Sequence, residues 1–310
     1  MRLGIVVPCY NEQEVLRETA KRLCGLVKSL VAQKKITRSS VVYFVDDGSK
    51  DGTWKIIESL ARENAHIRGI KLSRNRGHQN ALLAGLFTAE GDAIVSIDAD
   101  LQDDIKVIED MVGHYHKGVD VVYGVRQKRE TDTTFKRLTA ESFYRLMRLM
   151  KVEVLGNHAD FRLMSRKAIE ALKEFREVNL FLRGIVPLIG FTSSIVYYER
   201  AERFAGSSKY PVMKMLAFAL DGITSFSVIP LRMISTVGIL TFMVTVIMSL
   251  WILFVRIFTQ QAVPGWASTV LPMYFLGGIQ ILCVGVIGEY MGKIYNETKA
   301  RPRYIIETIV

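Results

Sequence analysis

Short apolar runs alternate with amphipathic stretches through the first part of the chain. The runs are rich in β-branched residues and lie at 3–7, 41–45, 67–72, 93–97 and 119–123, and charge interrupts two of them, at Arg68, Lys71 and Asp120. The stretches between them have helical spacing and lie at 14–31, 53–64, 79–89 and 105–117. Strands buried on both faces have continuous apolar runs, and strands that alternate with helices form parallel sheets. The pattern therefore predicts an α/β fold with a doubly wound, mostly parallel sheet.

The last third of the chain contains two long runs without charge, at 233–255 and 270–288. As a helix the first run would be about 34 Å long, and a bilayer core is about 30 Å thick. Residues 264–266 (Pro-Gly-Trp) predict a turn with an interfacial Trp, and residues 211–226 predict an interfacial helix. We therefore expect a domain at 1–209, an interfacial amphipathic helix at 210–230, two transmembrane helices within 231–292 (about 233–255 and 269–290), and a tail at 293–310.

Lysine and arginine residues flank these runs unevenly. The outer flanks carry Lys209, Lys214 and Arg232 before the first run and Lys293, Lys299, Arg301 and Arg303 after the second, whereas the loop between them has only Arg256. Because cytoplasmic flanks are enriched in cations, both termini and the α/β domain are predicted to face the cytoplasm at the inner (plasma) membrane. We expect no signal peptide, since Met1 and Arg2 lead directly into the first apolar run.

The formal net charge of +10 predicts an anionic partner, such as nucleic acid, an anionic membrane or a phosphate-bearing substrate. Nucleic acid is disfavoured because the basic residues fall in loops beside acidic strand ends and form no stripe. The three cysteines have no metal-ligand spacing and are expected to be reduced thiols.

Polar side chains follow four of the predicted strands, at 10–12, 46–49, 75–77 and 98–100. Ordinary turn chemistry explains one such strand end, but four in the same half of a sheet favour a polar cleft where ligands bind. Asp98 and Asp100 end the fourth strand, and their carboxylates could hold Mg²⁺ or Mn²⁺ on a substrate's phosphates. The cleft is therefore the predicted functional site.

Three further segments carry cations. Residues 124–134 predict a charged loop over the same sheet edge, and residues 202–210 a loop suited to phosphate oxygens. Residues 135–151 predict a basic helix with large apolar residues. That helix is consistent either with an anionic membrane surface or with ordinary core packing beneath a solvated basic face.

Several motifs together resemble a known family. They are VVPCYNE at 6–12, VDDGSKDGT at 45–53, NRGHQNALLAG at 75–85, DADLQD at 98–103, ADFRL at 159–163, RFAGSSKY at 203–210 and GEYMGKIY at 288–295. In this order they resemble the inverting family 2 glycosyltransferases with a GT-A (Rossmann-like) fold. Among these the chain is similar to the polyisoprenyl-phosphate glycosyltransferases, namely bactoprenol glucosyltransferases and, more distantly, dolichyl-phosphate mannose synthases.

The resemblance implies a sugar nucleotide donor, Mg²⁺ or Mn²⁺, and a polyprenyl phosphate acceptor in the membrane. The donor site implied by matching positions comprises Pro8, Tyr10, Asn11, Glu12, Asp46, Asp47, Gly77, Asp98, Ala99, Gln102 and Arg126. The implied metal ligands are Asp100, Asp98 and Gln102, and the implied catalytic residues are Asp160, Asp100 and Asp98. The implied acceptor and phosphate contacts are Arg162, Arg203, Ser207 and Lys209.

The expected reaction is transfer of glucose from UDP-glucose to undecaprenyl phosphate. Donors carrying N-acetylglucosamine, galactose or mannose remain alternatives, and a homo-oligomer is allowed. A non-catalytic membrane scaffold is the alternative of a different class, although it would not need Asp98, Asp100 and Asp160 together. A processive polysaccharide synthase is disfavoured because the sequence lacks a QxxRW motif. A lipid phosphate has a second pKa of about 6 and hardly needs deprotonation, so Asp160 could act as a base or could only position the acceptor.

Overall fold

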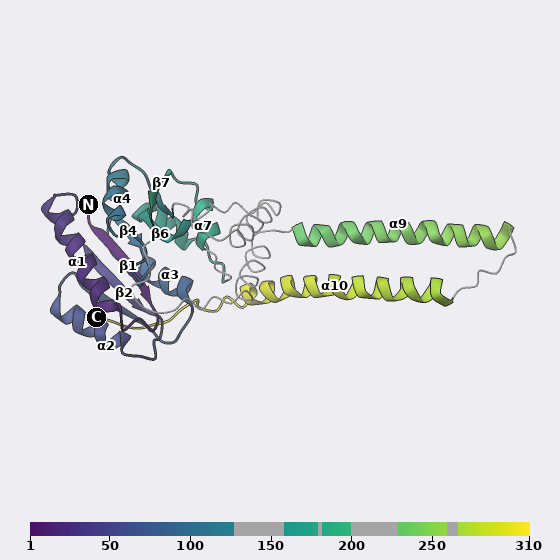
Figure 1. The fold of residues 1–310 in the computed structure, drawn as a ribbon, viewed down its shortest axis with the longest axis horizontal. Helices are drawn as coiled ribbons and strands as arrows, with labels where there is room; N and C mark the ends of the chain where they lie inside the picture. The colour runs from purple at the N-terminus through teal and green to yellow at the C-terminus, as the bar shows by residue number, and fades with distance from the viewer. Residues whose placement is uncertain (127–157, 179–181, 200–228, 259–265) are drawn as a thin grey trace.

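An eight-stranded sheet forms the centre of the α/β part of the molecule (Figure 1). The computed structural model describes residues 1–126, 158–178, 182–199, 229–258 and 266–310. The strands are β1 (Leu3–Cys9), β2 (Val41–Asp46), β3 (Ile67–Leu72), β4 (Ala93–Ser96), β5 (Val121–Arg126), β6 (His158–Ser165), β7 (Ser193–Tyr198) and β8 (Ile306–Ile309). Their order across the sheet is β7-β5-β6-β4-β1-β2-β3-β8. The predicted α/β, mostly parallel sheet is confirmed, since β4, β1, β2 and β3 are adjacent and parallel, as are β5 and β7.

Helices cover both faces of this sheet. They are α1 (Leu16–Ala32), α2 (Thr53–Glu63), α3 (His78–Thr88), α4 (Val107–His116), α6 (Arg166–Lys173) and α7 (Leu182–Leu188). One apolar core packs α1, α2 and α4 against the sheet, and a second packs α3, α6 and α7 against the opposite face. β1, β2 and β4 are buried on both faces for this reason, which is why their sequences are mainly continuous apolar runs.

Two strands were not predicted from the sequence. β6 lies between β4 and β5 and is antiparallel to both, so its residues reach the same sheet edge from the opposite direction. β8 follows the last helix and pairs antiparallel with β3, where Val310 N donates to Gly69 O and Gly69 N donates to Val310 O. β8 therefore forms the edge strand of the same sheet that contains β1.

Two long helices, α9 (Ile229–Phe258) and α10 (Trp266–Thr298), run side by side away from the α/β part (Figure 1). Among the described residues, one segment is long and apolar enough to cross a membrane, namely Phe275–Thr298 with a mean hydropathy of 1.5. Residues 229–241 form a shorter apolar segment of α9. The predicted interfacial helix, the basic helix at 135–151 and most of the loop at 124–134 lie outside the described residues.

Candidate active site

The ends of β1 and β2 are fastened to each other by hydrogen bonds. Asn11 has a left-handed backbone (φ 56°), its N–H donates to Ser49 Oγ, and its Oδ1 accepts from Lys50 N. Asp46 is buried at the end of β2, and its Oδ2 has no hydrogen-bond partner among the described residues. Burial raises the pKa of Asp46. An unpartnered buried carboxylate oxygen at a strand end is free to accept a hydrogen bond from a ligand.

Asp47 holds the loop that leads from β3 into α3. Its Oδ1 accepts from Arg76 N at 2.7 Å and its Oδ2 accepts from Gly77 N at 2.9 Å. Gly77 takes a φ of +88°, which suits glycine. Both oxygens of Asp47 are thus engaged in shaping the start of α3, and this geometry places His78, the first residue of that helix, beside β4.

The acidic turn after β4 contains the predicted metal ligands. Leu101 has a left-handed backbone (φ 56°), and Gln102 N donates to Asp100 Oδ1 at 3.3 Å. Burial and the neighbouring carboxylates of Asp103, Asp160 and Asp100 raise the pKa of Asp98 to about 6, although His78 opposes this. Several carboxylates therefore lie close together at this turn.

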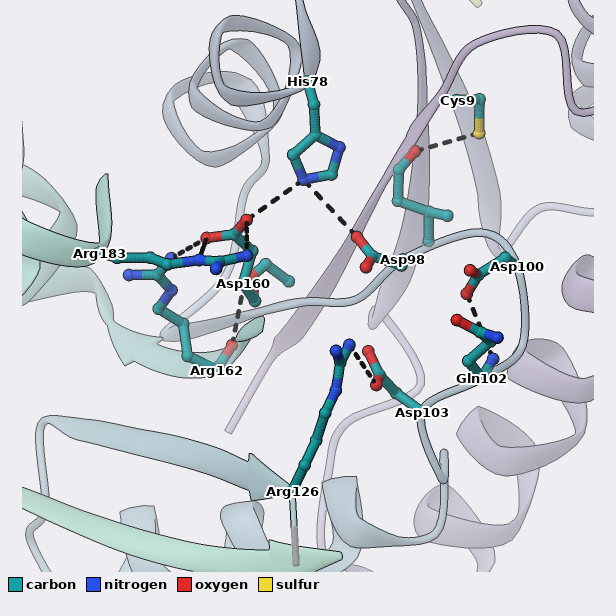
Figure 2. A network of polar contacts seen from close by, with 12 residues as sticks. Cys9, His78, Asp98, Asp100, Gln102, Asp103, Arg126, Asp160, Arg162 and Arg183 are labelled. Carbon is teal, nitrogen blue, oxygen red and sulfur yellow. Dashed lines mark hydrogen bonds and ion pairs between the residues drawn. The ribbon is translucent and has the colours of Figure 1, made fainter. Parts of the chain in front are cut away.

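Asp160 of β6 lies at the centre of a group of cationic side chains (Figure 2). Its Oδ1 accepts from Arg162 Nη2 at 2.6 Å, and its Oδ2 lies 3.3 Å from Arg183 Nη2 and 3.5 Å from His78 Nε2. The same His78 nitrogen is 3.6 Å from Asp98 Oδ1. His78 therefore connects the turn after β4 with the carboxylate of β6.

The charges in this group shift each other's pKa values. Burial alone would raise the pKa of Asp160, but the hydrogen bond with His78 and the charges of Arg183 and Arg162 lower it well below its usual range. Burial opposes a charged His78, yet Asp160 and Asp98 raise the pKa of its imidazole. Asp160 is consequently an ionised carboxylate that is already paired.

A second polar group joins the acidic turn to β5 and β7. Tyr198 donates its hydroxyl to Asp103 Oδ1 at 2.5 Å, and Arg126 Nη2 donates to the same oxygen at 3.1 Å. Arg126 Nε also donates to the Tyr198 hydroxyl. Burial and the Asp103 charge raise the pKa of Tyr198 well above its usual value. Arg126, predicted at the donor site, is thereby held against the acidic turn.

The structure gathers most of the predicted residues at one end of the sheet, as Figure 2 shows for those after β4 and on β6. Arg162 was predicted to contact the acceptor, but its side chain is 1% exposed and bound to Asp160 and Leu182 O. Tyr10 is exposed, whereas Pro8 lies within buried β1. Arg203, Ser207 and Lys209 lie outside the described residues, so their roles stay predictions.

Sequence reasoning missed His78, Arg183, Asp103 and Tyr198. His78 and Asp103 fall inside motifs that were recognised, and the position of His78 directly after a polar strand end was the available signal. Arg183 and Tyr198 carry no such signal, because they reach the site from distant segments.

The residues after β4 fit a hard divalent cation. Asp98, Asp100 and Gln102 offer oxygen atoms, the ligands that Mg²⁺ and Mn²⁺ prefer. Among the described residues no three His, Cys, Asp or Glu side chains form a complete metal site. A cation held here would need further ligands from a substrate, and donor phosphates would supply them.

The comparisons with known proteins agree with this geometry. The sequence profile of Glycosyl transferase family 2 matches residues 4–173. The uncharacterized glycosyltransferase YkoT of Bacillus subtilis (strain 168) is 50% identical over 307 residues, which cover 98% of this chain and 91% of the relative. The prophage bactoprenol glucosyl transferase homolog of Escherichia coli (strain K12) is 41% identical over 100% of this chain and 99% of the relative. The bactoprenol glucosyl transferase of Shigella phage SfX is 39% identical over 99% of both chains.

Solved structures support the fold. Mannosyl-3-phosphoglycerate synthase from Rubrobacter xylanophilus superposes with a TM-score of 0.50 at 16% identity, covering 77% of this chain and 75% of that one. At this level of identity the likeness concerns the fold, which is GT-A-like. The family profile matches more than half of the chain, and the full-length relatives are glycosyltransferases. The chain belongs to glycosyltransferase family 2 and is a glycosyltransferase.

Proposed function

We propose that this enzyme transfers glucose from UDP-glucose to undecaprenyl phosphate at the cytoplasmic face of the membrane, with inversion at the sugar. The observation that carries the proposal is the position of His78 Nε2, 3.6 Å from Asp98 and 3.5 Å from Asp160. A donor held at the turn after β4 and an acceptor held at β6 would meet there. The names of the relatives at 41% and 39% identity support the choice of sugar and lipid.

The donor half of the proposed site lies at the ends of β1, β2 and β4. Tyr10, Asn11, Glu12 and Asp46 border the nucleoside, and the orphaned Oδ2 of Asp46 supports this assignment. Pro8, Asp47, Gly77 and Ala99 shape the backbone around it. Asp98, Asp100 and Gln102 would hold Mg²⁺ or Mn²⁺, and Arg126 would reach the diphosphate. A bound divalent cation stabilises negative charge on the leaving nucleoside diphosphate.

We assign the acceptor half to β6 and to residues 202–210. Asp160 borders the acceptor, and Arg203, Ser207 and Lys209 are proposed to contact its phosphate. A lipid phosphate has a second pKa of about 6, so at neutral pH its oxygen is already the nucleophile. In-line positioning of that oxygen then supplies much of the rate enhancement.

The membrane attachment proposed from the sequence extends to both long helices. α10 contains the segment that is apolar enough to span, and α9 has 30 residues, about 45 Å of helix. We place residues 1–209 and 293–310 in the cytoplasm, residues 210–230 at the interface and two spans within 231–292. The cations that flank these helices support that orientation.

The test uses the full chain, purified in detergent, with undecaprenyl phosphate and a panel of labelled sugar nucleotides. We expect transfer from UDP-glucose that needs a divalent cation and is lost in Asp100→Asn. Exclusive transfer from GDP-mannose would overturn the choice of sugar. No transfer from any donor, with no donor hydrolysis, would instead support a non-catalytic scaffold.

A further inference from the structure

Arg183 is a partly exposed cation at the acceptor half of the site. It is the second residue of α7, and its side chain is 34% exposed. Its Nε and Nη2 face Oδ1 and Oδ2 of Asp160 at 3.5 and 3.3 Å. These two contacts use one edge of the guanidinium, and Nη1 forms no hydrogen bond or ion pair with another described residue. The arginine therefore has donors left for a ligand.

The start of α7 is fastened on both sides of the site. Leu182 N donates to Gln79 Oε1 of α3 at 3.0 Å, and Leu182 O accepts from Arg162 Nη1 at 3.3 Å. Arg162 is fully buried and spans from that carbonyl to Asp160. Residue 183 is consequently anchored through its neighbour, and the guanidinium is oriented by Asp160. Anchoring of this kind pre-organises a binding group.

The carboxylates of Asp98 and Asp160 would repel an incoming phosphate unless a cation lies beside them. A phosphate that approaches between Asp98 and Asp160 meets two carboxylates. Arg162 cannot compensate them toward a ligand because it is buried, and His78 lies between both carboxylates. His78 is also exposed, but its Nε2 is shared by both carboxylates, whereas Arg183 offers a permanently charged guanidinium with further N–H donors. Arginine binds phosphate through parallel N–H donors, which also fixes the direction of the phosphate oxygens.

We infer that Arg183 binds the acceptor's phosphate group, and that Asp160 acts through Arg183 as a positioning residue rather than as a base. The inference rests on the proposed function, because it assumes a phosphate-bearing acceptor. Asp160 has two oxygens, and both already face donors, so it orients the arginine while the acceptor oxygen attacks without losing a proton. Asp160 and Arg183 then form one functional unit.

The test measures KM for undecaprenyl phosphate and for UDP-glucose separately, in the full chain in detergent. For Arg183→Gln we expect the acceptor KM to rise about 10- to 100-fold, the range of a lost charge-assisted hydrogen bond, with little change in the donor KM. Arg183→Lys keeps the charge but loses the fork, so an intermediate rise is expected. Arg176→Gln, an exposed arginine before α7, is the matched control and should leave both KM values unchanged.

A double-mutant cycle separates positioning from base catalysis. If Asp160 acts through Arg183, adding Asp160→Asn to Arg183→Gln should cause little further loss. A full multiplicative loss, confined to kcat, would show that Asp160 works independently and would overturn the inference. So would an unchanged acceptor KM in Arg183→Gln. If Arg183→Gln does not fold, as judged by loss of UDP binding, the test rests on Arg183→Lys. An unchanged acceptor KM in that variant would overturn the inference.

The two proposals fail in different ways. A wild-type enzyme that transfers sugar to the lipid, combined with an unaltered acceptor KM in both Arg183 variants, refutes only the role of Arg183. A wild-type enzyme that binds UDP-glucose but glycosylates no polyprenyl phosphate refutes the proposed function, and the role of Arg183 with it.

Discussion

His78 Nε2 lies 3.5 Å from Oδ2 of Asp160, so the first residue of α3 contacts a strand more than 80 positions later in the chain. The imidazole is 44% exposed. Its partners on the two sides, Asp98 and Asp160, belong to the proposed donor and acceptor halves. The ring thus fixes the separation of two carboxylates that would otherwise repel each other.

Removal of this ring is expected to slow turnover more than it affects folding. In His78→Ala we expect kcat to fall about 10- to 100-fold, the loss typical of misplaced reacting groups, with a small change in Tm. His114→Ala on α4 is the control and should behave as wild type. A wild-type kcat in the His78 variant would show that the contact has no part in the reaction.

Asp98 should destabilise the metal-free protein at neutral pH. Its pKa in the folded state is raised from 3.8 to about 6, so the folded protein binds this proton more tightly than the unfolded chain does. Stability from this group is therefore highest at low pH and falls as the pH rises toward and through about 6. Asp98→Asn removes the charge and should raise the free energy of unfolding by about 1 kcal/mol at pH 7.5, after allowance for solvent screening.

Thermal unfolding without divalent cations at pH 7.5 and pH 5 checks this sign. The advantage of Asp98→Asn should shrink at pH 5, where wild-type Asp98 is protonated. Added Mn²⁺ should raise the Tm of the wild type and have less effect on the variant. An asparagine variant that is less stable at pH 7.5 would contradict the account.

The Tyr198 hydroxyl should matter for stability and for donor binding. It donates to buried Asp103 at 2.5 Å and accepts from Arg126. Tyr198→Phe removes a hydrogen bond to a charged group, so we expect a loss of about 1.5–3 kcal/mol in the free energy of unfolding. The KM for UDP-glucose should rise as well, because Arg126 loses its support. Tyr197→Phe, next in the chain and 60% exposed, serves as the control for both measurements.

Gly85 allows α3 to pack closely on the sheet. A Cβ at this position would lie 2.3 Å from Val6 Cγ1 and 2.8 Å from Val45 Cγ2. Gly85→Ala should therefore destabilise the fold by about 1–3 kcal/mol and displace His78 at the start of the same helix. In Gly113→Ala on α4, where a Cβ would meet no atom within 4 Å, stability should rise by up to about 1 kcal/mol. Denaturant unfolding and kcat, measured on both variants, provide the comparison.

The sequence predicted the parts of the fold that have local causes. β1, β2 and β4 are mainly apolar runs followed by polar residues, β3 is a shorter apolar pattern interrupted by Arg68 and Lys71, and their parallel order brings the polar residues to one edge. β6 was not predicted, because its antiparallel insertion between β4 and β5 depends on which edges are open after folding. His158–Ser165 contains Asp160 and Arg162 inside the sheet, and charged residues in a central strand do not resemble an apolar run.

The acidic residues of the candidate site could be predicted from the sequence, whereas the cationic residue Arg183 could not. Asp98 and Asp100 can be recognised as candidate site residues because they directly follow an apolar strand. Arg183 lies in a short apolar helix, and nothing in its neighbourhood indicates Asp160 as its partner. Such pairs form only when distant segments meet, so spacing along the chain cannot reveal them.

The pairing of β8 with β3 can form only late in synthesis of the chain. β3 leaves the ribosome early, whereas β8 follows α9 and α10, and Gly69 exchanges both of its backbone hydrogen bonds with Val310. Until the two long helices have been synthesised, β3 presents an open edge, which is the kind of edge that recruits strands from other molecules. The sheet is therefore completed only after α9 and α10 have been made, and a chain interrupted before that point keeps an unpaired strand edge that favours aggregation.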